Sequence, residues 1–256
     1  MVDHDGEPKS GEPLEHAADS QPRSEALGDL AQDLASTSLT LARRFAAGAT
    51  LWCTAPAWPA HARHIAVEFV HPVIVGKKAL PAVAVPGPDP VGSLRQLGRP
   101  GDVVVAVAAA DDPVVADVMR RAGAWGLVTV WIGMGDRVPT GAADQVLWLP
   151  DVDPLAPYGG RFVLLYHLLW ELTHVCFEHP GLLVETPESC EVGEVCVTCS
   201  DEGRLGEVVE VGAGDEASVR TATGTEPVDT SIVGAVLPGD LILVHAGTAI
   251  TIVDQG

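Results

Sequence analysis

Residues able to do metal or redox chemistry gather in the last quarter of this 256-residue chain. Cys196 and Cys199 stand three positions apart just before a valine-rich stretch, and His245 lies inside a later apolar run. A thiolate and an imidazole form a donor set for a soft transition metal, so Cys196 and His245 are candidate ligands. Because apolar neighbours flank His245, a core histidine that bonds a carbonyl remains the alternative.

Two familiar uses of a Cys-x-x-Cys pair fit this sequence poorly. A structural zinc site needs four ligands, usually as two separated pairs, and only Cys190 lies nearby upstream. A thioredoxin-like redox pair precedes a helix, whereas Ser200-Asp201-Glu202-Gly203 and then a strand pattern follow Cys199. Five cysteines, three of them clustered, also do not form a secreted disulfide framework.

The segment from Val195 to Asp254 resembles the HypC/HupF chaperones of nickel-iron hydrogenase assembly. The matching stretches are Val195-Cys196, Gly206 to Val211, Val233 to Asp240 with its Pro-Gly-Asp, and Leu243-Val244-His245-Ala246-Gly247. We expect this part, residues 190–256, to fold as a small OB-like antiparallel β-barrel, because short valine-rich strands alternate with glycine-containing turns.

The resemblance also implies a function and a site. Cys196 corresponds to the cysteine that transiently holds iron as Fe(CN)2CO, and His245 lies in the motif near it. Cys199 is then a second ligand, a resolving thiol or a structural residue, and the roles of Cys199 and Cys190 stay open. The implied partners are a HypD-like iron-delivery scaffold protein and the precursor of the nickel-iron hydrogenase large subunit. No permanently bound cofactor is implied.

Residues 24–181 are predicted to form a separate α/β domain. Strand-like runs such as Asp102 to Ala108 alternate with helical patterns such as Pro59 to Val70, which is typical of a doubly wound parallel sheet. This part resembles the sugar-isomerase (SIS) domains of the phosphoheptose-isomerase type. The matching stretches are His64 to Val70, Leu80 to Ala84, Leu97 to Val104 and Leu165 to Leu172.

The isomerase resemblance is weakest in the turns where a sugar phosphate would bind. The two turns expected to cradle a phosphate read Cys53-Thr54-Ala55-Pro56-Ala57-Trp58 and Ala108-Ala109-Ala110-Asp111-Asp112-Pro113. Proline removes an amide donor, tryptophan fills space and the aspartates repel phosphate. We therefore expect a non-catalytic scaffold, not an enzyme; a sugar-phosphate isomerase or sugar-phosphate-binding regulator is the alternative.

Glu68 stands where the resemblance implies a catalytic glutamate, and Phe162 stands where we expect its partner histidine. We accordingly interpret Glu68 as a vestigial isomerase position. The remaining histidines of this domain are interpreted as satisfied or exposed, without a ligand context: His61, His64, His71, His167 and His174.

Charge and composition limit the partners and the location that we expect for this protein. A net charge of −20 repels phosphate backbones and anionic membranes, which argues against nucleic acid and membrane as partners. Residues 1–23 are polar and acidic and are expected to form a disordered tail without a signal peptide, so we expect a cytoplasmic protein. The leucines of the last α/β helix exceed what one sheet face needs, which predicts a homo-oligomer through the SIS-like domain: Leu164, Leu165, Leu168, Leu169 and Leu172.

Overall fold

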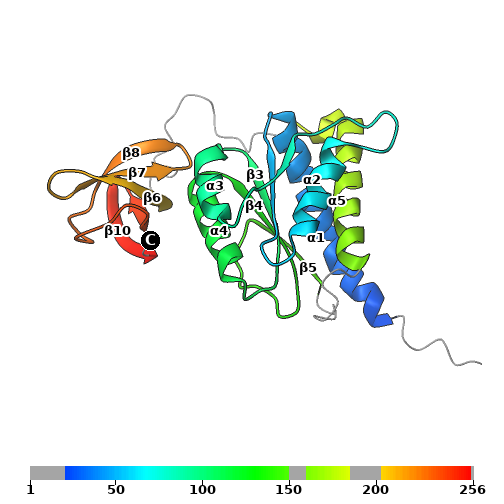
Figure 1. The fold of residues 1–256 in the computed structure, drawn as a ribbon, viewed down its shortest axis with the longest axis horizontal. Helices are drawn as coiled ribbons and strands as arrows, with labels where there is room; N and C mark the ends of the chain where they lie inside the picture. Colours follow the sequence, from blue (N-terminus) through cyan, green and yellow to red (C-terminus); the bar gives the residue numbers. More distant parts are fainter. Residues whose placement is uncertain (1–20, 150–159, 185–202, 255–256) are drawn as a thin grey trace, which may run out of the picture.

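The computed structural model describes residues 21–149, 160–184 and 203–254, which fold into an α/β domain and a small β-barrel (Figure 1). The barrel lies against the side of the α/β domain that carries helices α3 and α4 (Figure 1). No helix in these described ranges is long and apolar enough to cross a membrane.

The α/β domain is built on a five-stranded parallel sheet with the order β2-β1-β3-β4-β5. Its strands are β1 (Leu51–Thr54), β2 (Ala82–Ala84), β3 (Val103–Val107), β4 (Val128–Met134) and β5 (Gln145–Leu149). Its helices are α1 (Gln21–Ala46), α2 (Pro59–Val70), α3 (Pro90–Leu97), α4 (Pro113–Ala124) and α5 (Gly160–Glu178), followed by the 3-10 turn η1 (Pro180–Leu182). This arrangement confirms the predicted doubly wound fold.

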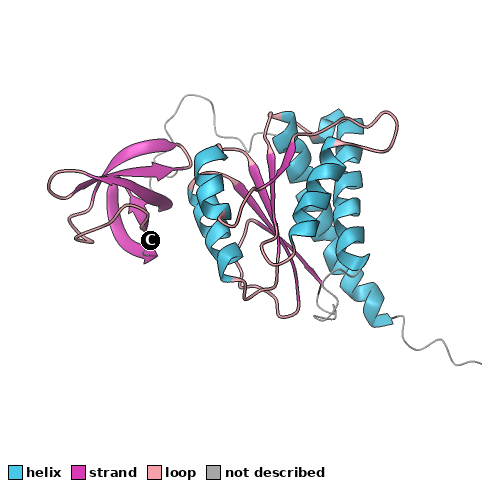
Figure 2. Cartoon of the chain, in the orientation of Figure 1, coloured by secondary structure: helices cyan, strands magenta, loops and turns pink. Residues whose placement is uncertain are grey.

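Helices cover both faces of the sheet, which is why its strands are continuously apolar (Figure 2). Along β3, Val103, Val105 and Val107 pack into the core shared with α1, α2 and α5. The alternate residues Val104 and Ala106 pack into a second core beneath α3 and α4. The side-chain period of two in a strand therefore divides one apolar run between two cores.

Two elements differ from the sequence-based expectation. Helix α1 begins at Gln21, so the last residues of the segment 1–23 that was expected to be a disordered tail are helical. Helix α3 was not predicted, because eight residues carry little periodicity. Its start is nevertheless encoded locally, since the Asp89 side chain accepts a hydrogen bond from the Gly92 amide and Pro90 occupies the first helical turn.

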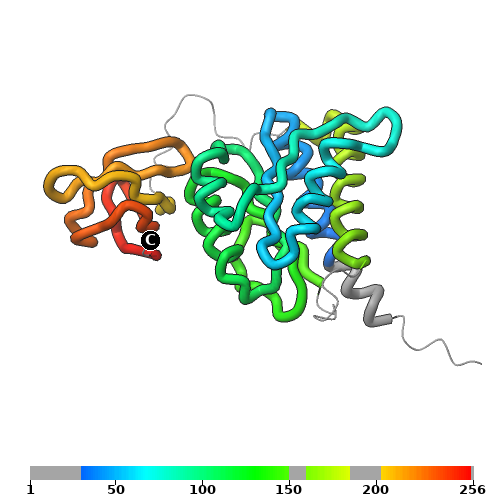
Figure 3. Tube along the Cα trace, in the orientation of Figure 1, coloured from blue at the N-terminus to red at the C-terminus, as the bar shows by residue number. Residues whose placement is uncertain are grey.

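The C-terminal part is a closed five-stranded barrel with the order β10-β8-β7-β6-β9. Its strands are β6 (Arg204–Val211), β7 (Glu216–Thr221), β8 (Gly224–Asp229), β9 (Leu241–His245) and β10 (Thr248–Asp254). The hairpin between β6 and β7 points away from the α/β domain (Figure 3). The barrel was expected to be antiparallel, but it closes through a parallel pairing of β8 with β10 at Asp229 and Thr248.

Candidate functional site

His245 ends strand β9 beside a tight turn. Its backbone pairs with Thr248 across the β9–β10 hairpin, and Ala246 and Gly247 between them have φ of 48° and 79°. A two-residue turn with positive φ at both positions is the type I′ hairpin connection, which favours glycine. The Ala-Gly that follows the histidine therefore has a backbone role, and it fixes the half-buried His245 at the tip of a hairpin.

The Pro238-Gly239-Asp240 motif also builds a turn. The Asp240 carboxylate accepts a hydrogen bond from the Leu237 amide, and the Asp240 carbonyl accepts one from the Val208 amide. Gly239 has φ of 99°, a conformation that L side chains rarely adopt. The motif thus connects the loop before β9 to strand β6.

The expected partners of His245 lie outside the described residues. Cys190, Cys196 and Cys199 all fall between residues 185 and 202, so the predicted Cys196–His245 metal site remains a prediction. The chain enters β6 close to His245, because Arg204 pairs with Val244. The described cysteines, Cys53 and Cys176, are buried, and burial raises the pKa of both thiols.

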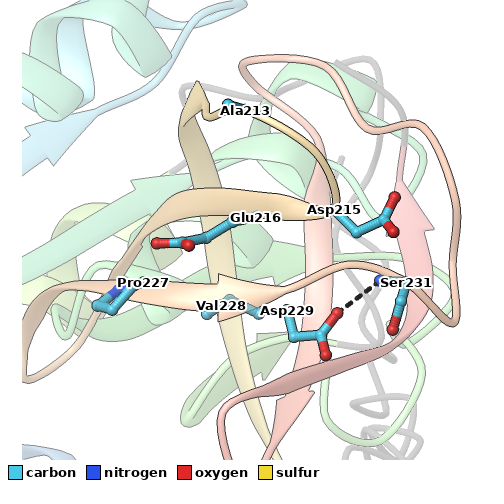
Figure 4. Close-up of a pocket in the computed structure, with 7 residues that line it drawn as sticks. All are labelled: Ala213, Asp215, Glu216, Pro227, Val228, Asp229 and Ser231. Carbon is cyan, nitrogen blue, oxygen red and sulfur yellow. Dashed lines mark hydrogen bonds between the residues drawn. The ribbon is translucent and has the colours of Figure 1, made fainter.

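A second feature of the barrel is an acidic hollow of about 560 Å³ at the ends of β7 and β8 (Figure 4). Asp215, Glu216 and Asp229 contribute carboxylates to its lining. The Asp229 carboxylate accepts a hydrogen bond from the Ser231 amide, which holds the pKa of Asp229 below its usual value. This bond shows that Asp229 shapes the loop after β8.

In the α/β domain, the helix end that could bind phosphate is closed by the protein's own carboxylate. The Asp112 side chain accepts hydrogen bonds from the amides of Val114 and Val115 at the start of α4. These amides are the donors that a phosphate at a helix N-terminus would use. This geometry gives a physical reason for the expectation that Asp112 disfavours phosphate, since its carboxylate already occupies these amides.

The carboxyl ends of β1 and β2 border a pocket of about 480 Å³ with an unusual lining. Five of its lining residues are prolines, which donate no amide hydrogen bond: Pro56, Pro59, Pro86, Pro88 and Pro90. Arg63 is the charged side chain among its lining residues. At these five positions the pocket offers no amide donor to a phosphate.

The structure brings together a cluster that the sequence interpretation missed: His64 and Glu68 on α2 with His167 on α5. The Glu68 Oε1 atom lies 3.2 Å from His64 Nε2 and 3.4 Å from His167 Nε2, and the two Nε2 atoms are 3.4 Å apart. Their side chains are 39%, 20% and 41% exposed in the order His64, Glu68, His167. Three potential ligand atoms therefore converge at an accessible site.

Tyr166 supports this cluster from the buried side. Its hydroxyl lies 2.8 Å from His64 Nδ1, and its side chain is almost fully buried. Burial, together with the Glu68 carboxylate, raises the pKa of Tyr166 to about 12. The hydroxyl hence stays protonated at neutral pH and can orient the His64 ring, as outer hydrogen bonds orient metal-binding histidines.

His64 and His167 are hydrogen-bonded and partly exposed, as expected, but the sequence interpretation did not foresee that both ring nitrogens lie beside Glu68. Their signal in the sequence was the i,i+4 spacing of His64 and Glu68, which places both on one helix face. The other histidines behave more as expected. His174 is buried between the carbonyls of Trp170 and Lys78, and His71 is exposed.

Phe162 fills space rather than leaving Glu68 without a histidine. It is completely buried, and its ring packs against those of Trp58 and His61. His167, five residues later on α5, supplies the histidine partner of Glu68. Position 162 therefore carries no histidine, as expected, but α5 turns His167 towards Glu68 on α2 from another position of the helix.

Comparisons with known proteins divide the chain at the same place as the fold. Residues 203–256 match the HupF/HypC family. This match covers the barrel and confirms the resemblance found on its motifs from Gly206 onwards, whereas Val195-Cys196 lies before the matched residues. No curated protein matches the chain.

The α/β domain has the fold of phosphoheptose isomerases. The structure of a phosphoheptose isomerase from Francisella tularensis superposes with a TM-score of 0.54 at 14% identity, covering 60% of this chain and 92% of the isomerase. The phosphoheptose isomerase GmhA from Neisseria gonorrhoeae superposes with a TM-score of 0.50 at 18% identity, covering 60% of this chain and 91% of that protein. At these identities the likeness establishes the fold alone.

Proposed function

We propose that this protein is a chaperone of nickel-iron hydrogenase maturation. The observation that carries the proposal is the HupF/HypC match over residues 203–256, on a barrel whose Pro-Gly-Asp and His-Ala-Gly motifs form defined turns. The barrel takes part in delivering Fe(CN)2CO to the large-subunit precursor, with Cys196 as the iron ligand and His245 beside it. Cys199 is a supporting thiol in this scheme, and the iron is cargo that leaves with the precursor.

The partners follow from this role. A HypD-like scaffold protein hands over the iron group, and the large-subunit precursor receives it. Affinity capture of the full chain from hydrogenase-expressing cells tests the proposal, with mass spectrometry as the readout. We expect both partners to co-purify with the wild type and both to be lost when Cys196 is replaced by alanine. Recovery of neither partner with the wild type would contradict the proposal.

The α/β domain acts in this scheme as a non-catalytic scaffold. Asp112 occupies the amides at the start of α4, and prolines line the pocket beside β1 and β2. We expect no calorimetric binding of sedoheptulose 7-phosphate at micromolar concentrations. Saturable binding in that range corresponds to about −8 kcal/mol and would restore the isomerase alternative.

The same domain also mediates self-association in our proposal. Leu165 and Leu169 are buried in the core, but Leu164 and Leu168 on α5 remain 58% and 37% exposed. Val67 on α2 is 53% exposed as well. Sedimentation velocity at tens of micromolar should show a species larger than the monomer, and replacing Leu164 and Leu168 by glutamate should shift it towards the monomer.

A second candidate function is favoured by one observation, the convergence of His64, Glu68 and His167. Tetrahedral Zn²⁺ with bonds of 2.0–2.1 Å has ligand atoms about 3.3 Å apart. The three ligand atoms here are separated by 3.2, 3.4 and 3.4 Å, which are the edges of one face of such a tetrahedron. We propose that this cluster binds a divalent transition metal, with one position left for water or a ligand.

A further inference from the structure

The barrel contacts the α3–α4 side of the α/β domain through a charged interface. The chain has 15 lysines and arginines against 35 acidic residues, so basic side chains are scarce. Four of these arginines contribute to the interface: Arg95, Arg120, Arg121 and Arg220. From the barrel, Glu207 and Asp254 face the arginines of α3 and α4. The two contacting surfaces are therefore complementary in charge.

Glu207 on β6 lies at the centre of this interface. Its side chain is only 3% exposed, and its carboxylate accepts hydrogen bonds from Arg121 Nη1 at 3.1 Å and from Trp125 Nε1 at 2.8 Å. Arg95 on α3 donates a further, short hydrogen bond to the same carboxylate. All three donors come from the α/β domain. The domain thus supplies three partners for one buried carboxylate of the barrel.

The three residues that donate to Glu207 also make further contacts with the barrel. Arg121 also donates to the Gly239 carbonyl at 2.6 Å, which ties the Pro-Gly-Asp turn to α4. Arg220 on β7 stacks on the Trp125 ring with 5.1 Å between its guanidinium carbon and the ring centroid, and it donates to the Arg95 carbonyl. The interface accordingly joins β6, β7 and the turn before β9 to both helices.

Apolar packing surrounds the polar network and brings the two domains into close contact. Leu241, the first residue of β9, is fully buried and belongs to the core beneath α3 and α4. Gly126 has φ of 80°, and a Cβ there would lie 2.9 Å from the Ala222 Cα. The backbones of the two domains thus approach each other closely enough for glycine to be required at this point.

We infer that the α3–α4 face is an internal docking site that holds the barrel in one orientation, with Glu207 as its positioning residue. Docking removes the Glu207 carboxylate from water, and that cost is offset only where Arg95, Arg121 and Trp125 meet it together. A rotated or shifted barrel would bury the carboxylate without all three donors. The two domains consequently move as one rigid body, and the barrel face that carries Glu207 and Gly239 is withheld from other proteins.

Nuclear magnetic relaxation of backbone amides in the full chain tests this inference directly. Rotational correlation times are measured for the barrel and for the α/β domain in the wild type and in Glu207→Lys. We expect one common correlation time in the wild type and a shorter time for the barrel than for the α/β domain in the variant. The Trp125 indole proton should also lose its protection from hydrogen exchange in Glu207→Lys.

Glu210→Lys is the matched control, because Glu210 lies on the same strand, is exposed and undergoes the same change of charge. It should behave as the wild type. A wild-type barrel that tumbles faster than the α/β domain, or a Glu207→Lys chain indistinguishable from Glu210→Lys, would overturn the inference.

A second variant covers the case in which Glu207→Lys unfolds the barrel, seen as collapsed amide dispersion for β6–β10. Arg121→Met leaves every barrel residue unchanged and removes the donor to both Glu207 and Gly239. Separate tumbling of a folded barrel in Arg121→Met supports the docking site, and unaltered common tumbling overturns it. These readouts do not involve hydrogenase, so they stand or fall independently of the proposed function.

Discussion

The two candidate sites of this protein differ in what reveals them. The barrel site is conspicuous in the sequence, because Cys196 and His245 stand in recognisable motifs, yet the described structure contains only His245. The α2–α5 cluster is inconspicuous in the sequence, because His167 is 99 positions from Glu68, yet its three ligand atoms lie within 4.8 Å of one another. Recognisable motifs mark each candidate residue of the barrel site, whereas helix packing builds the α2–α5 cluster, which no local motif records.

The largest expected effect separates the two sites by function. In a strain deleted for this gene, complementation with Cys196→Ala should abolish hydrogenase activity, because the thiolate is the proposed iron ligand. Complementation with His64→Ala should leave activity unchanged, because the proposed function assigns iron delivery to the barrel and not to the α2–α5 cluster. Circular dichroism of both purified variants checks that they are folded.

Two outcomes would contradict this division of roles. Full activity with Cys196→Ala would rule out the proposed iron ligand. Loss of activity with a folded His64→Ala protein would show that the α/β domain is more than a scaffold. Cys199→Ala and His245→Ala refine the result, since a supporting residue should reduce activity less than Cys196→Ala does.

The next effect concerns metal affinity at the α2–α5 cluster. To exclude binding by thiolates, the titration uses a chain in which Cys190, Cys196 and Cys199 are serine. In that background His167→Ala should weaken Zn²⁺ binding at least about tenfold, or about 1.4 kcal/mol, because one of three ligands is lost. Isothermal titration calorimetry provides the measurement.

His179→Ala is the control for that titration, since His179 is an exposed histidine just beyond the end of α5. It should bind Zn²⁺ as the parent chain does. Equal affinities for His167→Ala and His179→Ala would show that the cluster is an ordinary network of hydrogen bonds rather than a metal site.

The fold was predictable from sequence where local pattern and tertiary context agree. Pro59 to Val70 was predicted as a helix with the observed bounds, because proline at its first turn and apolar periodicity point to the same element. The continuous valines of β3 indicated a strand buried on both faces. The parallel closure of β8 on β10 was not predictable, since strand direction across the barrel depends on how the long β8–β9 loop returns.

The sites were less predictable than the fold for a physical reason. Glu68 could be placed from resemblance, but its partners depend on which face α5 turns towards α2, and His64 and His167 are 103 positions apart in the chain. Glu207 gave no signal at all, because a charged residue in an alternating strand normally faces water. In the structure it is buried against Arg95, Arg121 and Trp125 of the α/β domain, which no local pattern of β6 indicates.

A smaller effect tests whether the helix end at Asp112 is a structural cap. Asp112→Ala should lower the free energy of unfolding by about 1 kcal/mol, because the amides of Val114 and Val115 lose their acceptor. Asp111→Ala, at the exposed preceding residue, should change it by less than about 0.5 kcal/mol. Urea unfolding of both variants measures the difference, and equal values would remove the capping role.

The last effect is confined to alkaline pH and is a pH dependence to which Tyr166 contributes. Its pKa of about 12 in the folded protein exceeds the ordinary value of 10.0, so the folded state keeps the phenolic proton where the unfolded state loses it. Stability from this group is therefore complete below pH 10 and declines as pH rises from 10 towards 12. Tyr166→Phe should reduce that decline. Because other groups titrate in the same range, the measurement compares wild type and variant in the slope of the free energy of unfolding against pH. Identical slopes would mean that the Tyr166 hydroxyl ionises as readily in the folded as in the unfolded chain. The pKa of Tyr166 would then not be raised in the folded protein.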